Sequence, residues 1–212
     1  MKLYPILLNI EDRLIIVIGG GEVAYRKVKD LLLAGAIVRI ISPHFINEIQ
    51  ELKRTESNRI ELYNREYQHG DLEGARLVYT STDKEDVNKA VFREAEELGI
   101  FINSVDDPPN CSFYVPSSIR RGDLILAVST CGASPAMAAK LRREFQKDIP
   151  ENIEEILEAL REARSILQNY DHLSSRERGG ILKDIVNNNN LLLELTCEYN
   201  NGELEEFISN LI

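Results

Sequence analysis

The sequence predicts an α/β protein that begins with a parallel sheet, continues through a small α+β segment and ends in a helical region. Three observations support this prediction. A glycine-rich turn joins an apolar strand to a helix near the N-terminus, further strands and helices alternate up to residue 105, and helical spacing dominates from Pro150 onward. With 212 residues, 43% of them hydrophobic, the chain can bury a sizeable core.

The first element is the glycine-rich turn. Residues 14–18 are all apolar and have the length and branching of a strand buried on both faces. The chain then reads Gly19-x-Gly21-x-x-Ala24 at the start of a helix predicted over 22–34. In this register the first glycine allows a tight turn, the second lets the backbone approach a pyrophosphate, and the alanine lets the helix pack closely. The sequence therefore predicts a dinucleotide site; a glycine turn that binds nothing is the alternative.

Strands and helices continue to alternate after this turn. Strands are predicted over 37–41, 60–63, 76–80 and 100–105, and helices over 45–54 and 86–98. Such an alternation forms a parallel sheet with right-handed crossovers. Residues 1–112 are therefore predicted to be a Rossmann-type, nucleotide-binding domain, with residues 5–8 as an edge strand or a cover for the sheet.

The residues after the second strand bear on the choice of cofactor. In dinucleotide folds an acid at this position binds the ribose hydroxyls of NAD, whereas an arginine accommodates the 2′-phosphate of NADP. Here the chain reads Ser42-Pro43-His44, with neither an acid nor a following arginine. The residues alone leave NAD and NADP open, and His44 can equally be a loop residue without a ligand contact. Thr82 follows another strand, at the sheet edge where ligands bind.

Two acids, Asp106 and Asp107, directly follow the strand predicted over 100–105 and precede two prolines. Because adjacent side chains diverge, one acid is expected to face the cleft and the other to cap the turn. A carboxylate at this edge of the sheet is a candidate general base. Two plain turn acids are the alternative.

Residues 113–148 are predicted to be a separate α+β segment. Strands are predicted over 112–119 and 123–129, and a helix over 136–147. Ser134 is positioned to cap that helix and Pro135 to open it. Six basic residues stand against two acidic ones between Ser117 and Lys147: Arg120 and Arg121 in the predicted turn, and Lys140, Arg142, Arg143 and Lys147 on the helix. This basic segment indicates an anionic ligand, although a solvated helix face is the alternative.

Residues 149–212 are predicted to form a helical domain with a loop at the asparagine run 187–190. Thirteen acidic residues stand against five basic ones between Glu151 and the end of the chain. No motif in this domain indicates chemistry.

The overall composition excludes several classes of protein. A formal net charge of −10 argues against a nucleic-acid partner bound through phosphates. No apolar run is long enough to span a membrane, and residues 1–5 lack the layout of a signal peptide, so the expected location is the cytoplasm. The three cysteines (Cys111, Cys131 and Cys197) lack metal-binding spacing, and His69 and His172 are isolated, so no metal site is expected.

Four motifs of the chain occur in this order in a known enzyme family. They are Gly19-Gly-Gly-Glu-Val-Ala-x-Arg-Lys27, Asn103-Ser-Val-Asp-Asp-Pro108, Ser112-Phe-x-x-Pro116 and Ala127-Val-Ser-Thr-x-Gly-x-Ser-Pro135. Together they resemble precorrin-2 dehydrogenase, the NAD-dependent module of siroheme synthase that in some members is also a sirohydrochlorin ferrochelatase. The resemblance runs from about Leu3 to Phe145. No uroporphyrinogen methyltransferase domain follows, which implies the stand-alone form.

The resemblance implies a homodimer in which a Rossmann domain, a small dimerisation domain and a helical domain follow one another. It implies that precorrin-2 loses a hydride to NAD⁺ and a proton to the enzyme or solvent, giving sirohydrochlorin. Some members then insert Fe²⁺, and the cobalt corrinoid branch would use Co²⁺. The resemblance also favours NAD over NADP.

The resemblance further implies roles for individual residues. Asp106 corresponds to the essential aspartate, proposed as general base. Thr130, the other predicted catalytic residue, occupies a position that is a serine in some relatives. Glu22, Val23, Pro43 and His44 fall where the family contacts NAD. The tetrapyrrole substrate is rich in carboxylates, which basic residues hold through charge-assisted hydrogen bonds. Its predicted ligands are Ser134 and the basic residues Arg120, Arg121, Lys140, Arg142 and Arg143.

A non-catalytic function is the alternative hypothesis. The chain could be a non-catalytic NAD-sensing module that binds a protein partner through its acidic helical tail. The basic segment argues against it, because a sensor has no use for a polycarboxylate site.

Overall fold

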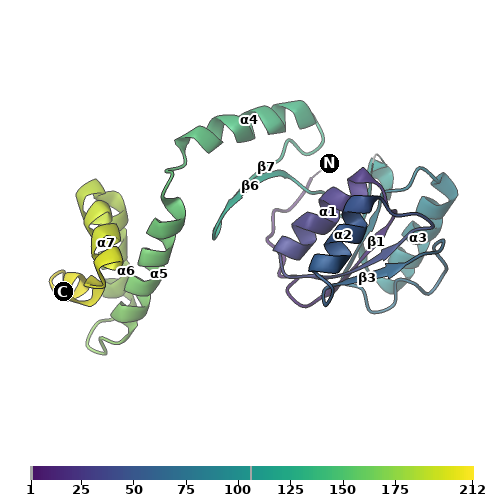
Figure 1. Ribbon diagram of the computed structural model, residues 1–212. Helices are drawn as coiled ribbons and strands as arrows, with labels where there is room; N and C mark the ends of the chain where they lie inside the picture. The colour runs from purple at the N-terminus through teal and green to yellow at the C-terminus, as the bar shows by residue number, and fades with distance from the viewer. Residues whose placement is uncertain (1, 106) are drawn as a thin grey trace. The chain divides into compact units, whose positions relative to one another are not determined.

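The computed structural model describes residues 2–105 and 107–212 (Figure 1). The chain divides into two compact units. One spans residues 4–115, and the other spans residues 116–212 together with Lys2 and Leu3. We call them the sheet unit and the hairpin–helix unit.

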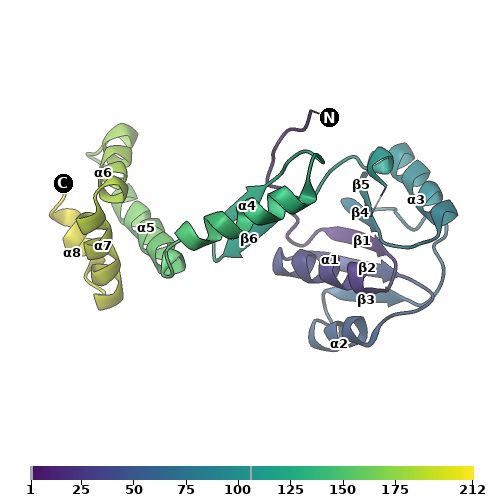
Figure 2. The same cartoon turned by 90° about the horizontal axis from the view of Figure 1, so that it is seen from above.

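The sheet unit is built on five parallel strands, which confirms the predicted α/β class. They are β1 (Leu14–Ile18), β2 (Ile37–Ile41), β3 (Ile60–Tyr63), β4 (Leu77–Thr80) and β5 (Phe101–Ser104). The strands lie side by side in the order β3-β2-β1-β4-β5 (Figure 2). The chain moves outward from β1 to β3 and then crosses to β4, so the order reverses between β1 and β4. Ligands of open α/β sheets bind at such a switch point.

Helices cover both faces of the sheet. Helices α1 (Glu22–Leu33) and α2 (Asn47–Thr55) lie on one face, and α3 (Glu85–Leu98) lies on the other (Figure 1). Alternate residues of β1 point to opposite faces, so Ile15 packs in the core under α1 and α2 while Ile16 packs in the core under α3. Both side chains are fully buried. This two-sided burial explains why the β1 sequence is apolar without alternation.

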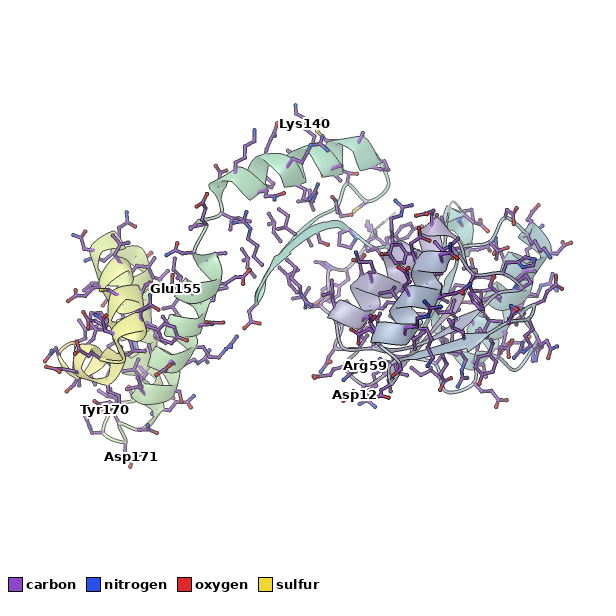
Figure 3. The ribbon with its side chains drawn as sticks, viewed as in Figure 1. Asp12, Arg59, Lys140, Glu155, Tyr170 and Asp171 are labelled. Carbon is purple, nitrogen blue, oxygen red and sulfur yellow. The ribbon has the colours of Figure 1, made fainter. Side chains whose placement is uncertain are left out.

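Loops at the N-terminal ends of the strands are also tied together. Asp12 and Arg59 lie side by side (Figure 3), with 3.0 Å between Oδ1 and Nη1. The lead-in over residues 5–8 has no regular structure, and Ile6 and Leu7 are exposed. The prediction of an edge strand or a sheet cover there is therefore wrong. With a proline at position 5, that segment lacks one of the backbone donors that a strand needs.

The hairpin–helix unit begins with an antiparallel pair, β6 (Ser117–Arg121) and β7 (Leu124–Val128), followed by α4 (Pro135–Asp148). The predicted basic turn is wrong, because Arg120 and Arg121 lie within β6. The two-residue turn is Gly122-Asp123, and Gly122 has the positive φ of 52° that favours glycine in tight hairpins. The strand also begins later than predicted, after Pro116, which has no N–H to donate.

Four helices complete this unit: α5 (Ile153–Gln168), α6 (Ser175–Asn187), α7 (Asn189–Asn201) and α8 (Leu204–Ser209). They share one core, in which Leu167, Ile185 and Leu195 are fully buried. The predicted asparagine loop is wrong. Only Asn188 separates α6 from α7, because its side-chain oxygen accepts hydrogen bonds from the first N–H groups of α7 and so caps that helix.

Candidate functional site

The turn between β1 and α1 requires glycine at two positions, because other chain segments approach its backbone closely. Gly19 has a φ of 123°, and a Cβ there would lie 2.6 Å from the carbonyl oxygen of Ser81. A Cβ on Gly20 would lie 2.0 Å from the carbonyl oxygen of His44. Gly21 differs, because a Cβ there would meet nothing within 4 Å. The first two glycines therefore shape the turn, and the third leaves open space above it.

The N-terminus of α1 opens onto this space. Gly21 is the N-cap residue, and among the described residues no side chain accepts a hydrogen bond from the first turn. The first N–H groups of a helix need acceptors, and the helix dipole favours a negatively charged one. Glu22 and Val23 begin this first turn, and the family resemblance implies that they contact the cofactor. The turn can therefore receive a phosphate.

A cleft of about 490 Å³ lies over the glycine turn. It is lined by residues 18–21 of the turn, residues 41–46 after β2, Glu66 and Tyr67 of the β3–β4 connection, and residues 81–84 with Val87 after β4. The cleft thus stands at the carboxyl ends of β1, β2 and β4, where the strand order reverses. The structure brings together the predicted Gly19, Gly21, Ser42, Pro43, His44 and Thr82 in this one cleft.

The loop after β2 is fixed by its own hydrogen bonds. Ser42 is buried and its Oγ donates to the carbonyl oxygen of His44 at 2.7 Å. Asn64 Nδ2 donates to the carbonyl oxygen of Pro43 at 3.0 Å. The Ser42 hydroxyl is therefore engaged with its own loop, while Pro43 and His44 are exposed at the cleft.

The loop after β4 is held in a similar way. Thr82 Oγ1 accepts from the N–H of Lys84 at 2.9 Å, and Asn88 Nδ2 donates to the Thr82 carbonyl at 3.0 Å. Lys84 Nζ lies 2.6 Å from Glu66 Oε1 across the cleft wall. The charged side chains among the described lining residues are thus Glu66, Asp83 and Lys84, and two of these neutralise each other.

Asp106, the predicted general base, lies outside the described residues. Its neighbour Asp107 precedes the short 3₁₀ helix η1 (Pro108–Asn110), and its Oδ2 accepts from Asn110 Nδ2 at 2.6 Å. Cys111 Sγ lies 3.2 Å from both the N–H and the carbonyl oxygen of Ser104, and burial raises the pKa of this thiol. The segment after β5 is therefore tied back to the strand end. That Asp106 faces the cleft stays a prediction.

The loop before α4 belongs to the hairpin–helix unit. Thr130 Oγ1 donates to the carbonyl oxygen of Ser134 and accepts from its N–H, both at 3.0 Å. Ser134 Oγ in turn accepts from the N–H of Met137 at 3.2 Å and so caps α4 as predicted. The Thr130 hydroxyl therefore donates its proton within the loop, and Thr130 stabilises the conformation of the loop.

The predicted substrate-binding cations do not all share one surface. Successive strand residues point to opposite faces, so Arg120 and Arg121 diverge, and Arg121 Nη1 donates to the Pro150 carbonyl at 3.3 Å. On α4, Lys140, Arg143 and Lys147 recur at helical spacing and are exposed, whereas Arg142 is half-buried. Figure 3 shows Lys140 on the outer side of α4.

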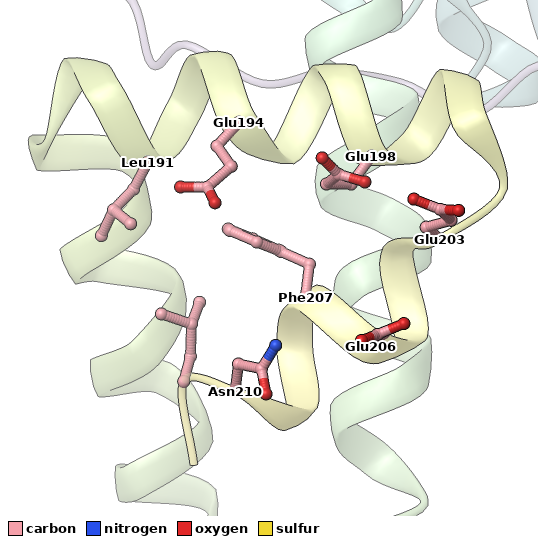
Figure 4. A pocket seen from close by; sticks show the side chains of 8 residues that line it. Leu191, Glu194, Glu198, Glu203, Glu206, Phe207 and Asn210 are labelled. Carbon is pink, nitrogen blue, oxygen red and sulfur yellow. The ribbon is translucent and has the colours of Figure 1, made fainter.

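A second hollow, of about 290 Å³, lies among α7 and α8. Glu194, Glu198, Glu203 and Glu206 surround Phe207 there (Figure 4). Four carboxylates repel an anionic ligand, so this hollow does not suit a nucleotide or a polycarboxylate. Within the described part of the chain, no group of three or more His, Cys, Asp or Glu side chains is arranged to hold a metal ion. No helix there is long and apolar enough to cross a membrane.

The fold and the glycine cleft define a dinucleotide-binding protein. Residues 6–117 match the family model described as putative NAD(P)-binding, which is more than half of the chain, so the chain belongs to this family. Residues 121–147 match a second model, described as sirohaem biosynthesis protein central. A nicotinamide cofactor therefore fits the cleft.

Curated relatives of the chain include siroheme synthases. The siroheme synthase of Photorhabdus laumondii is 37% identical over 153 residues, which cover 72% of this chain and 32% of the relative. That of Pseudoalteromonas translucida is 33% identical over 179 residues, covering 84% of this chain and 37% of the relative. The chain spans about a third of the length of these relatives.

A solved structure of SirC, precorrin-2 dehydrogenase, has the same fold, with a TM-score of 0.76 at 23% identity over 99% of this chain and 98% of that one. The comparisons confirm the resemblance that the motifs predict.

Proposed function

We propose that this protein is an NAD-dependent precorrin-2 dehydrogenase acting in the cytoplasm. The observation that carries the proposal is the glycine cleft, with open space at Gly21 and an uncapped α1 N-terminus. The match of residues 121–147 to a siroheme-biosynthesis segment supports precorrin-2 as the substrate. In this reaction precorrin-2 loses one hydride to the cofactor and one proton to a base, giving sirohydrochlorin.

NAD is the proposed cofactor rather than NADP. A 2′-phosphate needs a cation near the end of β2. Among the described lining residues the one basic side chain is Lys84, which is paired with Glu66 and follows β4 instead. The exposed residues after β2, Pro43 and His44, offer backbone groups and an uncharged side chain that suit a ribose. We expect NADH to bind at least about tenfold more tightly than NADPH, measured by fluorescence titration.

Different segments of the chain are proposed to bind the cofactor, take the proton and bind the substrate. The glycine turn and the first turn of α1 would hold the pyrophosphate, and the loops after β2 and β4 would orient the two ends of the cofactor. When bound, the nicotinamide supplies the hydride acceptor. Asp106 is proposed to take the proton from the macrocycle, and the loop around Thr130 and Ser134 to shape the substrate site.

Substitution of Asp106 tests this assignment. Asp106→Asn keeps the size of the side chain but cannot take a proton, so turnover should fall by about two to four orders of magnitude while NADH still binds. Asp107→Asn is the matched control, because its carboxylate is bonded to Asn110 in the turn. Normal turnover in Asp106→Asn would remove this residue from the mechanism.

The substrate carboxylates are proposed to bind the basic side chains of β6 and α4. The exposed face of Lys140 and Arg143 is the strongest part of this patch, with Arg120, Arg121 and Arg142 as further candidates. Substrate KM should rise with added salt, because exposed charges are screened.

A homodimer and a metal substrate complete the proposal. Apolar side chains of β7 and α4, among them Ile125 and Phe145, are exposed and would be covered by a second copy. Insertion of Fe²⁺ or Co²⁺ into sirohydrochlorin is tested by comparing the rate with protein to the uncatalysed rate.

The alternative, an NAD sensor with a protein partner, is favoured by the acidic hollow of α7 and α8. It requires that the protein bind NADH but have no affinity for a tetrapyrrole.

A further inference from the structure

Helix α3 contains a buried acid that the proposed reaction does not use. Glu94 is 1% exposed, and no other acidic side chain in the described part of the chain is fully buried. Its neighbours Glu96 and Glu97 on the same helix are exposed. A carboxylate is removed from water at a large cost in free energy unless it is hydrogen-bonded, so its partners define its role.

Both oxygens of Glu94 have hydrogen-bond donors on the connection between β3 and β4. Oε1 accepts from the N–H of Leu72 at 2.9 Å, and Oε2 accepts from the hydroxyl of Tyr67. Burial, together with the hydrogen bond and charge of Glu94, raises the pKa of Tyr67, which therefore keeps its proton as a donor. One side chain of α3 thus holds two points of a distant loop.

This loop is one wall of the nucleotide cleft. Tyr67 and Glu66 line the cleft, and Tyr67 packs against the same core cluster as Val87. Other contacts also hold the loop. Arg65 donates to both oxygens of Asp71, at 2.7 and 2.6 Å, Lys84 pairs with Glu66, and His69 Nε2 lies 3.5 Å from Glu97 Oε2 on the exposed face of α3. The Lys84–Glu66 pair is exposed and contributes little, whereas the Glu94 contacts are buried.

We propose that Glu94 is a positioning residue that sets the wall of the nucleotide cleft through Tyr67. Glu94 does not line the cleft and does not touch the ligand. It fixes the place and orientation of the Tyr67 ring, and the Leu72 contact fixes the backbone beyond it. The inference rests on the proposed function only in that a dinucleotide occupies the cleft. It predicts that nucleotide affinity depends on an acid that the glycine motif does not contain.

Two conservative variants test this role in the full chain. Tyr67→Phe keeps the ring and removes the hydroxyl, and Glu94→Gln keeps the shape and removes the charge. Each should raise the dissociation constant of NADH about tenfold, the size expected when one charge-assisted hydrogen bond that holds a binding wall is lost. The KM for NAD should rise similarly while kcat at saturating NAD stays within about twofold. Glu96→Gln, on the exposed face of the same helix, is the matched control and should leave both constants unchanged.

The double variant and thermal melting separate positioning from a general loss of stability. If both groups act through one contact, Tyr67→Phe should have little further effect on affinity in the Glu94→Gln background. Variants that melt at lower temperature but bind NADH with the wild-type constant would overturn the inference. If Glu94→Gln fails to fold, the NADH dissociation constant of Tyr67→Phe alone tests the inference. A wild-type protein that binds no NADH would instead refute the proposed function itself.

Discussion

The central strands of the sheet unit and the hairpin with α4 differ in how completely they bury their apolar residues. In the sheet unit the strands β1, β2 and β4 are almost wholly buried between helices. In β6, β7 and α4 the buried residues are Ile119 and Ala138, while Ile125 is 38% and Phe145 is 44% exposed. A sheet covered on both faces is a complete folding unit, whereas a two-stranded hairpin with one helix lacks the area to be stable alone. The first unit is therefore built to hold a cofactor rigidly, and the hairpin and α4 are built to be completed by another surface.

The largest effect is expected from the glycine turn of the sheet unit. Gly20→Ala places a Cβ 2.0 Å from the His44 carbonyl oxygen, and since that oxygen belongs to the backbone, the loop after β2 must move. We expect a loss of about 3 kcal/mol or more in the free energy of unfolding, measured by urea denaturation.

Gly21→Ala is the matched control, because nothing lies within 4 Å of its Cβ. It should unfold like the wild type yet lose NADH binding, since the methyl group enters the space that the pyrophosphate needs. Equal stability losses in the two alanine variants would contradict this division of roles within the turn.

A change of assembly is expected from the hairpin–helix unit. Phe145→Ser removes an exposed apolar side chain of α4, and the proposed homodimer should dissociate to a monomer at concentrations where the wild type is dimeric. Sedimentation velocity measures this shift. Leu193→Ser, at a 67% exposed position of α7, should leave the mass of the assembly unchanged. A monomeric wild-type protein would contradict the proposed homodimer.

The smallest effect is a pH dependence in the sheet unit. Burial alone would raise the pKa of Asp71, but hydrogen bonds from Arg65 and the N–H of Gln68, with the charge of Arg65, hold it below its ordinary value. A carboxyl group with a lowered folded pKa adds stability above its unfolded pKa of about 4, and this stability is lost as the pH falls through the folded value.

Asp71→Asn should accordingly be less stable than the wild type at pH 7, with the difference in unfolding free energy shrinking below about pH 4. Urea denaturation at both pH values measures it. A difference that stays constant with pH would show that the Asp71 charge does not stabilise the β3–β4 connection.

The sequence predicts the strands and helices of the sheet unit far better than the long-range contacts that shape its cleft. The succession of strands and helices along the chain, and the cleft residues from Gly19 to Thr82, follow from local apolar runs and from the glycine register. The sequence does not predict the roles of Gly20 and Tyr67, because each depends on a contact with a residue distant in the chain. Gly20 approaches His44, and Tyr67 donates to Glu94. A third consecutive glycine was the one available signal for the first of these.

In the hairpin–helix unit the errors have local causes. The run of asparagines was interpreted by composition as a loop, but Asn188 caps a helix, a role that the same residue type favours. The predicted basic turn begins two residues before the observed one, because the Gly122-Asp123 pair forms the tight turn and leaves Arg120 and Arg121 in the strand. Which carboxylates of a substrate would meet which cations is not a local property, so the sequence indicates only the basic segment.

The most direct test of the central claim is to mix the protein with NAD⁺ and enzymatically made precorrin-2 and to follow the absorbance of the oxidised macrocycle. The account predicts that sirohydrochlorin forms together with NADH in equal amounts, and that Gly21→Ala abolishes both. A protein that binds NADH but leaves precorrin-2 unchanged would contradict it.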